Sequence, residues 1–129
     1  MAVTQRREDH PQEYCQRISQ VLGRIGDKWS LQVVDRLGDG PHRFSDLLRS
    51  IDAISQRMLT LTLRTLERDG LVRRTVTPSL PPRVDYELTE LGQSLREPVR
   101  VLSEWVVRNM DKMDSARHGY DLATGIEAD

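Results

Sequence analysis

The chain has 129 residues, of which 37% are hydrophobic, and its 19 basic and 20 acidic side chains leave a formal net charge of −1. This length predicts one compact domain, and no apolar run reaches the roughly 18 residues that a membrane-spanning helix needs. The single cysteine, Cys15, excludes an internal disulfide framework, and the charged opening residues carry no apolar leader, so we expect a cytoplasmic protein.

Charge is distributed unevenly along the chain. Residues 1–40 are neutral, residues 41–85 carry eight Arg against five acids for a net +3, and residues 86–129 have a net charge of −4. A basic middle segment in a nearly neutral protein is typical of local contact with nucleic acid.

Two helices are predicted in the first forty residues. Residues 1–10 lack periodicity and are predicted to form a disordered arm. A helix follows over 11–24, and Asp27 is a suitable N-cap for a second helix that ends at 38–41, a segment with two glycines and a proline. The apolar residues that recur at helical spacing here are Tyr14 or Cys15, Ile18, Val21, Leu22, Ile25, Trp29, Val33, Val34 and Leu37.

A short third helix is predicted from Phe44, Leu47, Leu48 and Ile51, and a fourth from the cap residue Ser55 to residues 69–70. The fourth helix has two contrasting arcs. Its apolar arc is predicted to consist of Met58, Leu59, Thr62, Leu63 and Leu66. Its opposite arc consists of Gln56, Arg57, Thr60, Arg64 and Arg68, and Leu61 lies outside the core arc.

Alternating residues then predict strands over 71–77 and 84–89, joined by a proline-rich tip over 78–83. Thr89 is predicted to cap a last long helix, which Pro98 should kink or divide, and 115–129 is expected to be a flexible acidic tail. The predicted fold is therefore mainly α (α+β): a winged helix-turn-helix domain over 11–114, with a two-stranded wing and N- and C-terminal dimerisation helices.

The polar arc of the fourth helix has two interpretations. It is a solvated face, or it is the recognition helix of a helix-turn-helix, since Gln and Arg pair with the edges of adenine and guanine. A preceding short helix and a following hairpin that carries Arg73, Arg74 and Arg83 favour DNA binding.

At this point the sequence resembles a known family. The segments "GDKW", "RFSDL", "ISQRMLT", "LERDGLV" and "PPRVDYELTELG", in this order between Cys15 and Trp105, are similar to those of HxlR-type transcriptional regulators. These are bacterial and archaeal winged-helix proteins related in fold to the MarR group. The resemblance implies a homodimer whose interface includes Tyr14, Ile18, Val21, Leu22, Val99, Leu102, Trp105, Val106 and Met110. It implies DNA contacts at Ser55, Gln56, Arg57, Thr60, Arg64, Pro82 and Arg83, and we add a phosphate contact at Lys28.

Cys15 is a candidate redox sensor, because several members of this family sense oxidants through a cysteine near the start of the first helix. Here Gln16 follows it in place of the usual proline, and Cys15 lies one position further from Trp29 than the family pattern has it. A small buried hydrophobe or an idle thiol is the alternative. Arg68 either pairs with an acid such as Asp69 or lies free in solvent.

No catalytic motif is found, and the histidines His10, His42 and His118 lack the spacing of metal ligands, so we expect no enzyme, no metal and no cofactor. The predicted function is a homodimeric repressor that binds a pseudo-palindromic operator in double-stranded DNA, associates with the nucleoid, and responds to an oxidant or a small molecule. The alternative is a winged-helix module that contacts only proteins.

Overall fold

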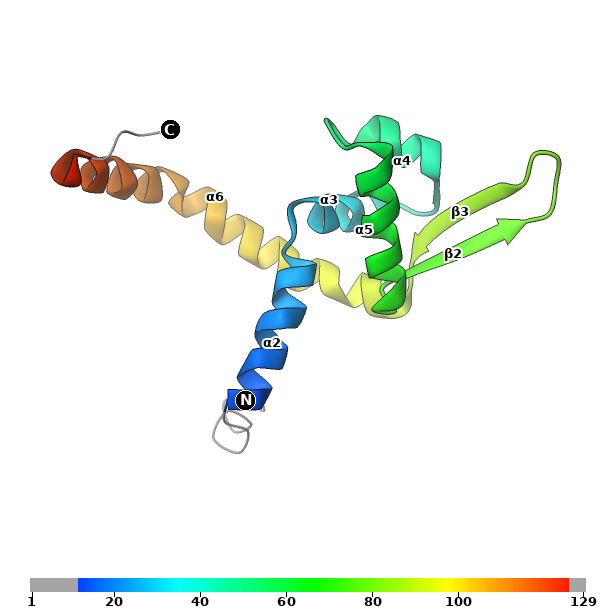
Figure 1. Cartoon of the computed structure of the whole chain (residues 1–129), viewed down its shortest axis with the longest axis horizontal. Helices are drawn as coiled ribbons and strands as arrows, with labels where there is room; N and C mark the ends of the chain where they lie inside the picture. The colour runs from blue at the N-terminus through cyan, green and yellow to red at the C-terminus, as the bar shows by residue number, and fades with distance from the viewer. Residues whose placement is uncertain (1–11, 126–129) are drawn as a thin grey trace. The chain divides into compact units, whose positions relative to one another are not determined.

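The computed structural model describes residues 12–125, so the predicted arm over 1–10 lies outside the described residues. The chain divides into two compact units, Met1–Ser94 and Leu95–Asp129. In chain order, the elements are α2 (Gln12–Ile25), α3 (Lys28–Leu37), β1 (His42–Arg43), α4 (Phe44–Ser50), α5 (Gln56–Arg68), β2 (Val72–Thr77), β3 (Arg83–Leu88) and α6 (Glu90–Thr124) (Figure 1).

The helix boundaries of the first unit follow from local capping. The Asp27 carboxylate accepts a hydrogen bond from the backbone N–H of Trp29 at 3.1 Å, and Ser55 Oγ accepts one from Met58 at 3.0 Å. Each bond satisfies a backbone donor that the first turn of a helix leaves unpaired. After α5, Gly70 adopts φ +78°, which ends the helix and turns the chain into β2. Both predicted N-caps are confirmed.

The sheet contains three strands, in the antiparallel order β1-β3-β2. β2 and β3 form the predicted wing, which Figure 1 shows as a hairpin that extends away from α5. Beyond its first residue, Val72, β2 is exposed along its whole length. The two-residue strand β1 was not predicted; it pairs His42 with Tyr86 and Arg43 with Asp85, so His42 belongs to the sheet.

The core of the first unit lies under α5. Leu59, Leu63 and Leu66 of α5 are buried, as predicted from the apolar arc. Met58 was predicted to join them, but 38% of it is exposed, because the first turn of α5 carries it to the rim of a surface pocket. The other buried apolar residues are Val33, Val34, Leu37, Leu47, Ile51, Ile54, Leu71, Val72 and Leu88.

The first turn of α6 packs tightly against the base of the wing. Thr89 Oγ1 donates a hydrogen bond to the carbonyl of Gly70 at 2.6 Å and accepts one from the N–H of Gly92 at 3.1 Å, which confirms Thr89 as the predicted cap. A Cβ at Gly92 would lie 2.1 Å from the carbonyl oxygen of Leu71, so only glycine fits this position.

Two parts of the prediction for α6 are wrong. Of the two outcomes expected at Pro98, a kink or a division, the division does not occur, because α6 continues through Pro98. Because proline cannot donate to the carbonyl four residues earlier, the helix lacks a bond to Ser94, the residue at which the first unit ends. The helix also continues to Thr124, through much of the segment expected to be a flexible tail. It ends at Gly125, whose φ of +76° is typical of a helix stop.

Candidate nucleic-acid interface

The polar arc of α5 is mostly open to solvent. Gln56, Arg57 and Arg64 are exposed, and Thr60 is half-buried. Thr60 Oγ1 donates a hydrogen bond to the carbonyl of Gln56 at 2.9 Å, which leaves its methyl group and both oxygen lone pairs for an outside partner. Leu61, placed outside the core arc by its sequence position, is 45% exposed.

A shallow hollow separates α5 from the wing. Gln56, Thr60 and Arg64 line it on the α5 side, and Arg74 and Tyr86 line it on the side of the sheet. A second shallow hollow lies over α5 itself, where Arg57 and Leu61 join the same three residues. Two strands and one helix thus bring hydrogen-bonding side chains to one face. Arg74 was noted in the sequence as a wing residue, but it was not among the predicted contacts.

The arginines of this face differ in whether an acid already neutralises them. Arg83 Nε lies 3.0 Å from Asp85 Oδ2, and Arg73 lies 3.5 Å from Glu87. By contrast, Arg57, Arg64 and Arg74 form no ion pair with any residue between 12 and 125. These three guanidinium groups therefore keep all their donors for a partner, while Arg83 must share its donors with Asp85.

Three of the predicted DNA contacts are partly engaged elsewhere or lie outside the two hollows. Ser55 Oγ uses one of its two lone pairs to cap α5, and it retains its other lone pair and its hydroxyl proton. Lys28 opens α3 and lies outside both hollows, with its Nζ 4.5 Å from the centroid of the Trp29 ring. Pro82 is exposed just before β3, and it too lines neither hollow.

An ion pair connects α2 to the end of α5. Arg24 Nε and Nη2 lie 2.9 Å and 3.3 Å from the two carboxylate oxygens of Asp69. Asp69 therefore pairs with Arg24, and Arg68 takes part in no ion pair of the described residues.

Apolar side chains are exposed on the helices for which a dimer interface was predicted. α2 contains no buried residue, and Val21 and Leu22 are 40% and 60% exposed, while Tyr14 and Ile18 are half-buried. In the second unit Val99 is half-buried. The exposed large apolar residues between positions 95 and 125 are the predicted Leu102, Trp105, Val106 and Met110, together with Val101, Val107, Met113, Tyr120 and Leu122, which were not in the predicted set.

Other functional features are few. Cys15 is a free, half-buried thiol on α2. Over residues 12–125, no three His, Cys, Asp or Glu side chains come together as metal ligands. None of the helices in that range is long and apolar enough to cross a membrane.

Comparison with known proteins identifies the family. Residues 24–114 match the model of the HxlR-like helix-turn-helix family. The chain belongs to this family. The HTH-type transcriptional regulator YtfH of Escherichia coli strain K12 is 38% identical over 98 residues, which are 76% of this chain and 78% of YtfH. An HTH-type transcriptional regulator of Methanothermobacter thermautotrophicus is 47% identical over 93 residues, 72% of this chain and 71% of that protein.

Solved structures agree with this assignment. The redox regulator HypR in its reduced form superposes with a TM-score of 0.70 at 41% identity, over 77% of this chain and 98% of HypR. The resemblance to HxlR-type regulators and the winged-helix fold are confirmed. This protein is a transcriptional regulator of the helix-turn-helix type.

Proposed function

We propose that the protein is a homodimeric repressor that binds a pseudo-palindromic operator in the nucleoid, within the cytoplasm. The observation that carries this proposal is the cluster of three arginines without ion pairs, Arg57, Arg64 and Arg74, on the face shared by α5 and the wing. A guanidinium that no acid neutralises is suited to phosphate and to the guanine edge.

Each residue of this face has a proposed role. Gln56 and Arg57, in the first turn of α5, read base edges, because the start of a recognition helix is the part that reaches into the major groove. Arg64 and Arg74 lie on opposite sides of the same hollow and bind phosphates that flank the groove.

The remaining predicted contacts have lesser proposed roles. Ser55 and Thr60 add hydrogen bonds or a methyl contact, and Pro82 with Arg83 lies along the neighbouring backbone. Lys28 can reach a phosphate only if its ammonium group moves away from the Trp29 ring, so we expect it to contribute the least of these residues to DNA affinity.

The dimer is proposed to form through α2 and the second unit. The support is physical: α2 and the second unit each expose several large apolar side chains to water, and a second copy of the chain would bury them. A dimer would also place two copies of α5 against two half-sites, which a palindromic operator requires.

The test is a titration of labelled duplex DNA, taken from the region upstream of the protein's own gene, by fluorescence anisotropy at several salt concentrations. With two phosphate-binding arginines, Arg64 and Arg74, in each of two subunits, the logarithm of affinity should fall with the logarithm of salt concentration with a slope of about −4. Scrambled duplex is the control. Equal binding of both duplexes, or a flat salt response, would refute sequence-specific binding and favour a protein-contact module.

The oligomeric state and the repressor role need separate measurements. Sedimentation velocity should give twice the chain mass of 14.9 kDa. A reporter gene behind the same upstream DNA should be less active when the protein is present. Higher reporter activity would instead identify an activator, and a monomer that binds a single half-site would refute the dimer.

A redox response is proposed for Cys15, and it is supported by the similarity to the redox regulator HypR. Oxidation of Cys15 would form a disulfide. Because each chain has one cysteine, this disulfide must join two subunits, or one subunit and a small thiol. Two Cys15 thiols would lose two electrons and two protons to hydrogen peroxide, which leaves as two waters. Peroxide should then lower DNA affinity and produce a reducible dimer band, and Cys15→Ser should abolish both effects. An unchanged affinity would leave Cys15 as an inert thiol.

A further inference from the structure

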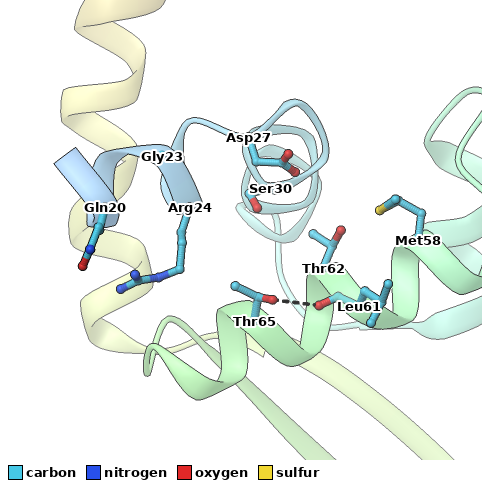
Figure 2. A pocket seen from close by; sticks show the side chains of 9 residues that line it. All are labelled: Gln20, Gly23, Arg24, Asp27, Ser30, Met58, Leu61, Thr62 and Thr65. Atoms are coloured by element: carbon cyan, nitrogen blue, oxygen red, sulfur yellow. Dashed lines mark hydrogen bonds between the residues drawn. The ribbon is translucent and has the colours of Figure 1, made fainter. Parts of the chain in front are cut away.

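A pocket lies between α2, α3 and α5, apart from the polar arc of α5. All of its lining residues belong to the first unit, and Figure 2 shows them from close by. They are Gln20, Gly23, Arg24, Asp27, Ser30, Met58, Leu61, Thr62 and Thr65.

Two hydroxyl groups in this pocket are unusual. Ser30 and Thr62 are only 3% and 5% exposed, and neither hydroxyl has a hydrogen-bond partner among the described residues. No side-chain oxygen in that part of the chain is both fully enclosed and unpaired, so both hydroxyl oxygens keep some access to solvent, and both residues line the pocket. Figure 2 shows them in the space between α3 and α5. Hydroxyls this deep are normally hydrogen-bonded, so they are a ready pair of donors and acceptors for a ligand.

Thr65 provides an internal comparison on the same wall. Its Oγ1 donates to the carbonyl of Leu61 at 3.0 Å, so this hydroxyl is already satisfied within α5. A helical threonine normally has this bond available to it. The hydroxyl of Thr62 does not make it, and is therefore free to bond into the pocket.

The charges of the pocket favour a cation. Arg24 is neutralised by two hydrogen bonds to Asp69. Asp27 has no ion-pair partner within residues 12–125, and only its Oδ2 is used, for the cap on Trp29. The carboxylate of Asp27 therefore gives this pocket one negative charge that no neighbouring cation balances. Oδ1 of Asp27 is available to accept a hydrogen bond from an ammonium group.

The other end of the pocket is apolar. Met58 and Leu61 are 38% and 45% exposed, and both line it. A small hydrocarbon or aromatic group placed on them would remove apolar surface from water. Met is also a favourable neighbour for an aromatic ring.

We propose that this pocket is an effector site for a small amphipathic amine. Its ammonium group binds Asp27, the hydroxyls of Ser30 and Thr62 bond to its polar atoms, and its apolar body covers Met58 and Leu61. Leu61 also lines the hollow that contains Arg57, so occupancy acts on the helix proposed to read DNA. The regulatory part of this inference rests on the proposed function, whereas the binding part does not.

The binding test uses three probes that share a phenethyl group and differ in charge: cationic 2-phenylethylamine, neutral 2-phenylethanol and anionic 3-phenylpropionate. Each is titrated into full-length ¹⁵N-labelled protein and followed by two-dimensional NMR. The amine should give saturable shifts at the amides of Ser30, Leu61 and Thr62, with a dissociation constant of about millimolar, as expected for a small fragment. The anion should bind at least about fivefold more weakly.

Variants of the lining residues locate the site. Asp27→Asn keeps a good N-cap and removes only the charge, and it should weaken the amine about fivefold. Thr62→Val with Ser30→Ala should also weaken it, whereas Thr65→Val, on the same wall, should not. Equal binding of the three probes, no saturation, or an unchanged affinity in Asp27→Asn would overturn the site.

The regulatory part is tested by DNA anisotropy with and without the amine, at ionic strength matched with ammonium chloride. Wild-type DNA affinity should change at least about fivefold, and that of Asp27→Asn should not. Amine binding with unchanged DNA affinity would overturn the effector role. Absence of specific DNA binding without any amine would instead count against the proposed function, while the NMR result would still decide the site.

Discussion

Replacing Arg64 by alanine should weaken DNA binding far more than replacing Arg68, although both changes remove one positive charge from the same exposed side of α5. Arg64 lines both hollows over α5 and has no acid partner, whereas Arg68 lines neither hollow. The pair of variants therefore separates a specific contact from the effect of overall charge.

The magnitude follows from the contact expected at each half-site. Loss of one phosphate contact per subunit should flatten the salt slope by about 1.8 for a dimer, since each contact contributes about 0.9. A base contact, instead, would cost about 1–3 kcal/mol with little change in slope. The Arg68→Ala slope should match that of the wild type within the error of the titration.

Fluorescence anisotropy against the same duplex, at four or more salt concentrations, measures both quantities, and circular dichroism checks that each variant keeps its helix content. Equal losses in the two variants would mean that only net charge matters, and the assignment of the α5 face would then be wrong. No loss in either would remove α5 from the interface.

The other predictions concern the fold and the assembly. Gly92→Ala should lower the free energy of unfolding by about 1–3 kcal/mol, because the new Cβ would lie 2.1 Å from the carbonyl oxygen of Leu71. Gly119→Ala should raise this free energy by up to about 1 kcal/mol, because a Cβ there has no heavy atom within 4 Å and alanine favours the helix. Urea denaturation of both variants and the wild type measures the differences. Trp105→Glu should weaken the proposed dimer by at least about 2 kcal/mol, as measured by analytical sedimentation, and Ser103→Glu, on the same helix, should not. Arg100 hydrogen-bonds to Glu97 and lowers the pKa of that carboxyl below its ordinary value of 4.5, so stability from the pair should be present at neutral pH and lost as the pH falls through the lowered pKa. Thermal melts of Glu97→Gln and wild type should therefore differ at neutral pH and converge in acid.

The features predicted correctly from the sequence are those that local chemistry decides. Three helices are capped by Asp27, Ser55 and Thr89, each of which accepts a hydrogen bond from a backbone N–H two or three residues further along the chain. Each cap was predicted because a residue of this type stands just before a helical pattern. The buried arc of α5 followed from helical spacing. The wing followed from alternation between two strands that are adjacent in sequence.

The features that were missed depend on distant contacts. β1 has two residues, too few to alternate, and it exists because β3 presents a free edge to it. Asp69 pairs with Arg24, which lies 45 positions away in the sequence. No rule of sequence spacing predicts this partner in preference to Arg68, the residue next to Asp69. The predicted position of Met58 failed for the same reason, since the pocket beside it is made by α2 and α3.

α5 presents three faces, and this arrangement connects the two proposals. Leu59, Leu63 and Leu66 fix the helix to the core. Arg64 faces the wing on one side, and Thr62 faces the pocket on the other. Because the buried face holds the helix in one position, a ligand in the pocket can influence DNA only by shifting or stiffening α5 as a body. A movement of the whole helix affects every contact that α5 makes with DNA, so Arg64→Ala should retain most of the change in DNA affinity that the probe amine causes. Complete loss of that change in Arg64→Ala would mean that the amine acts through Arg64 alone.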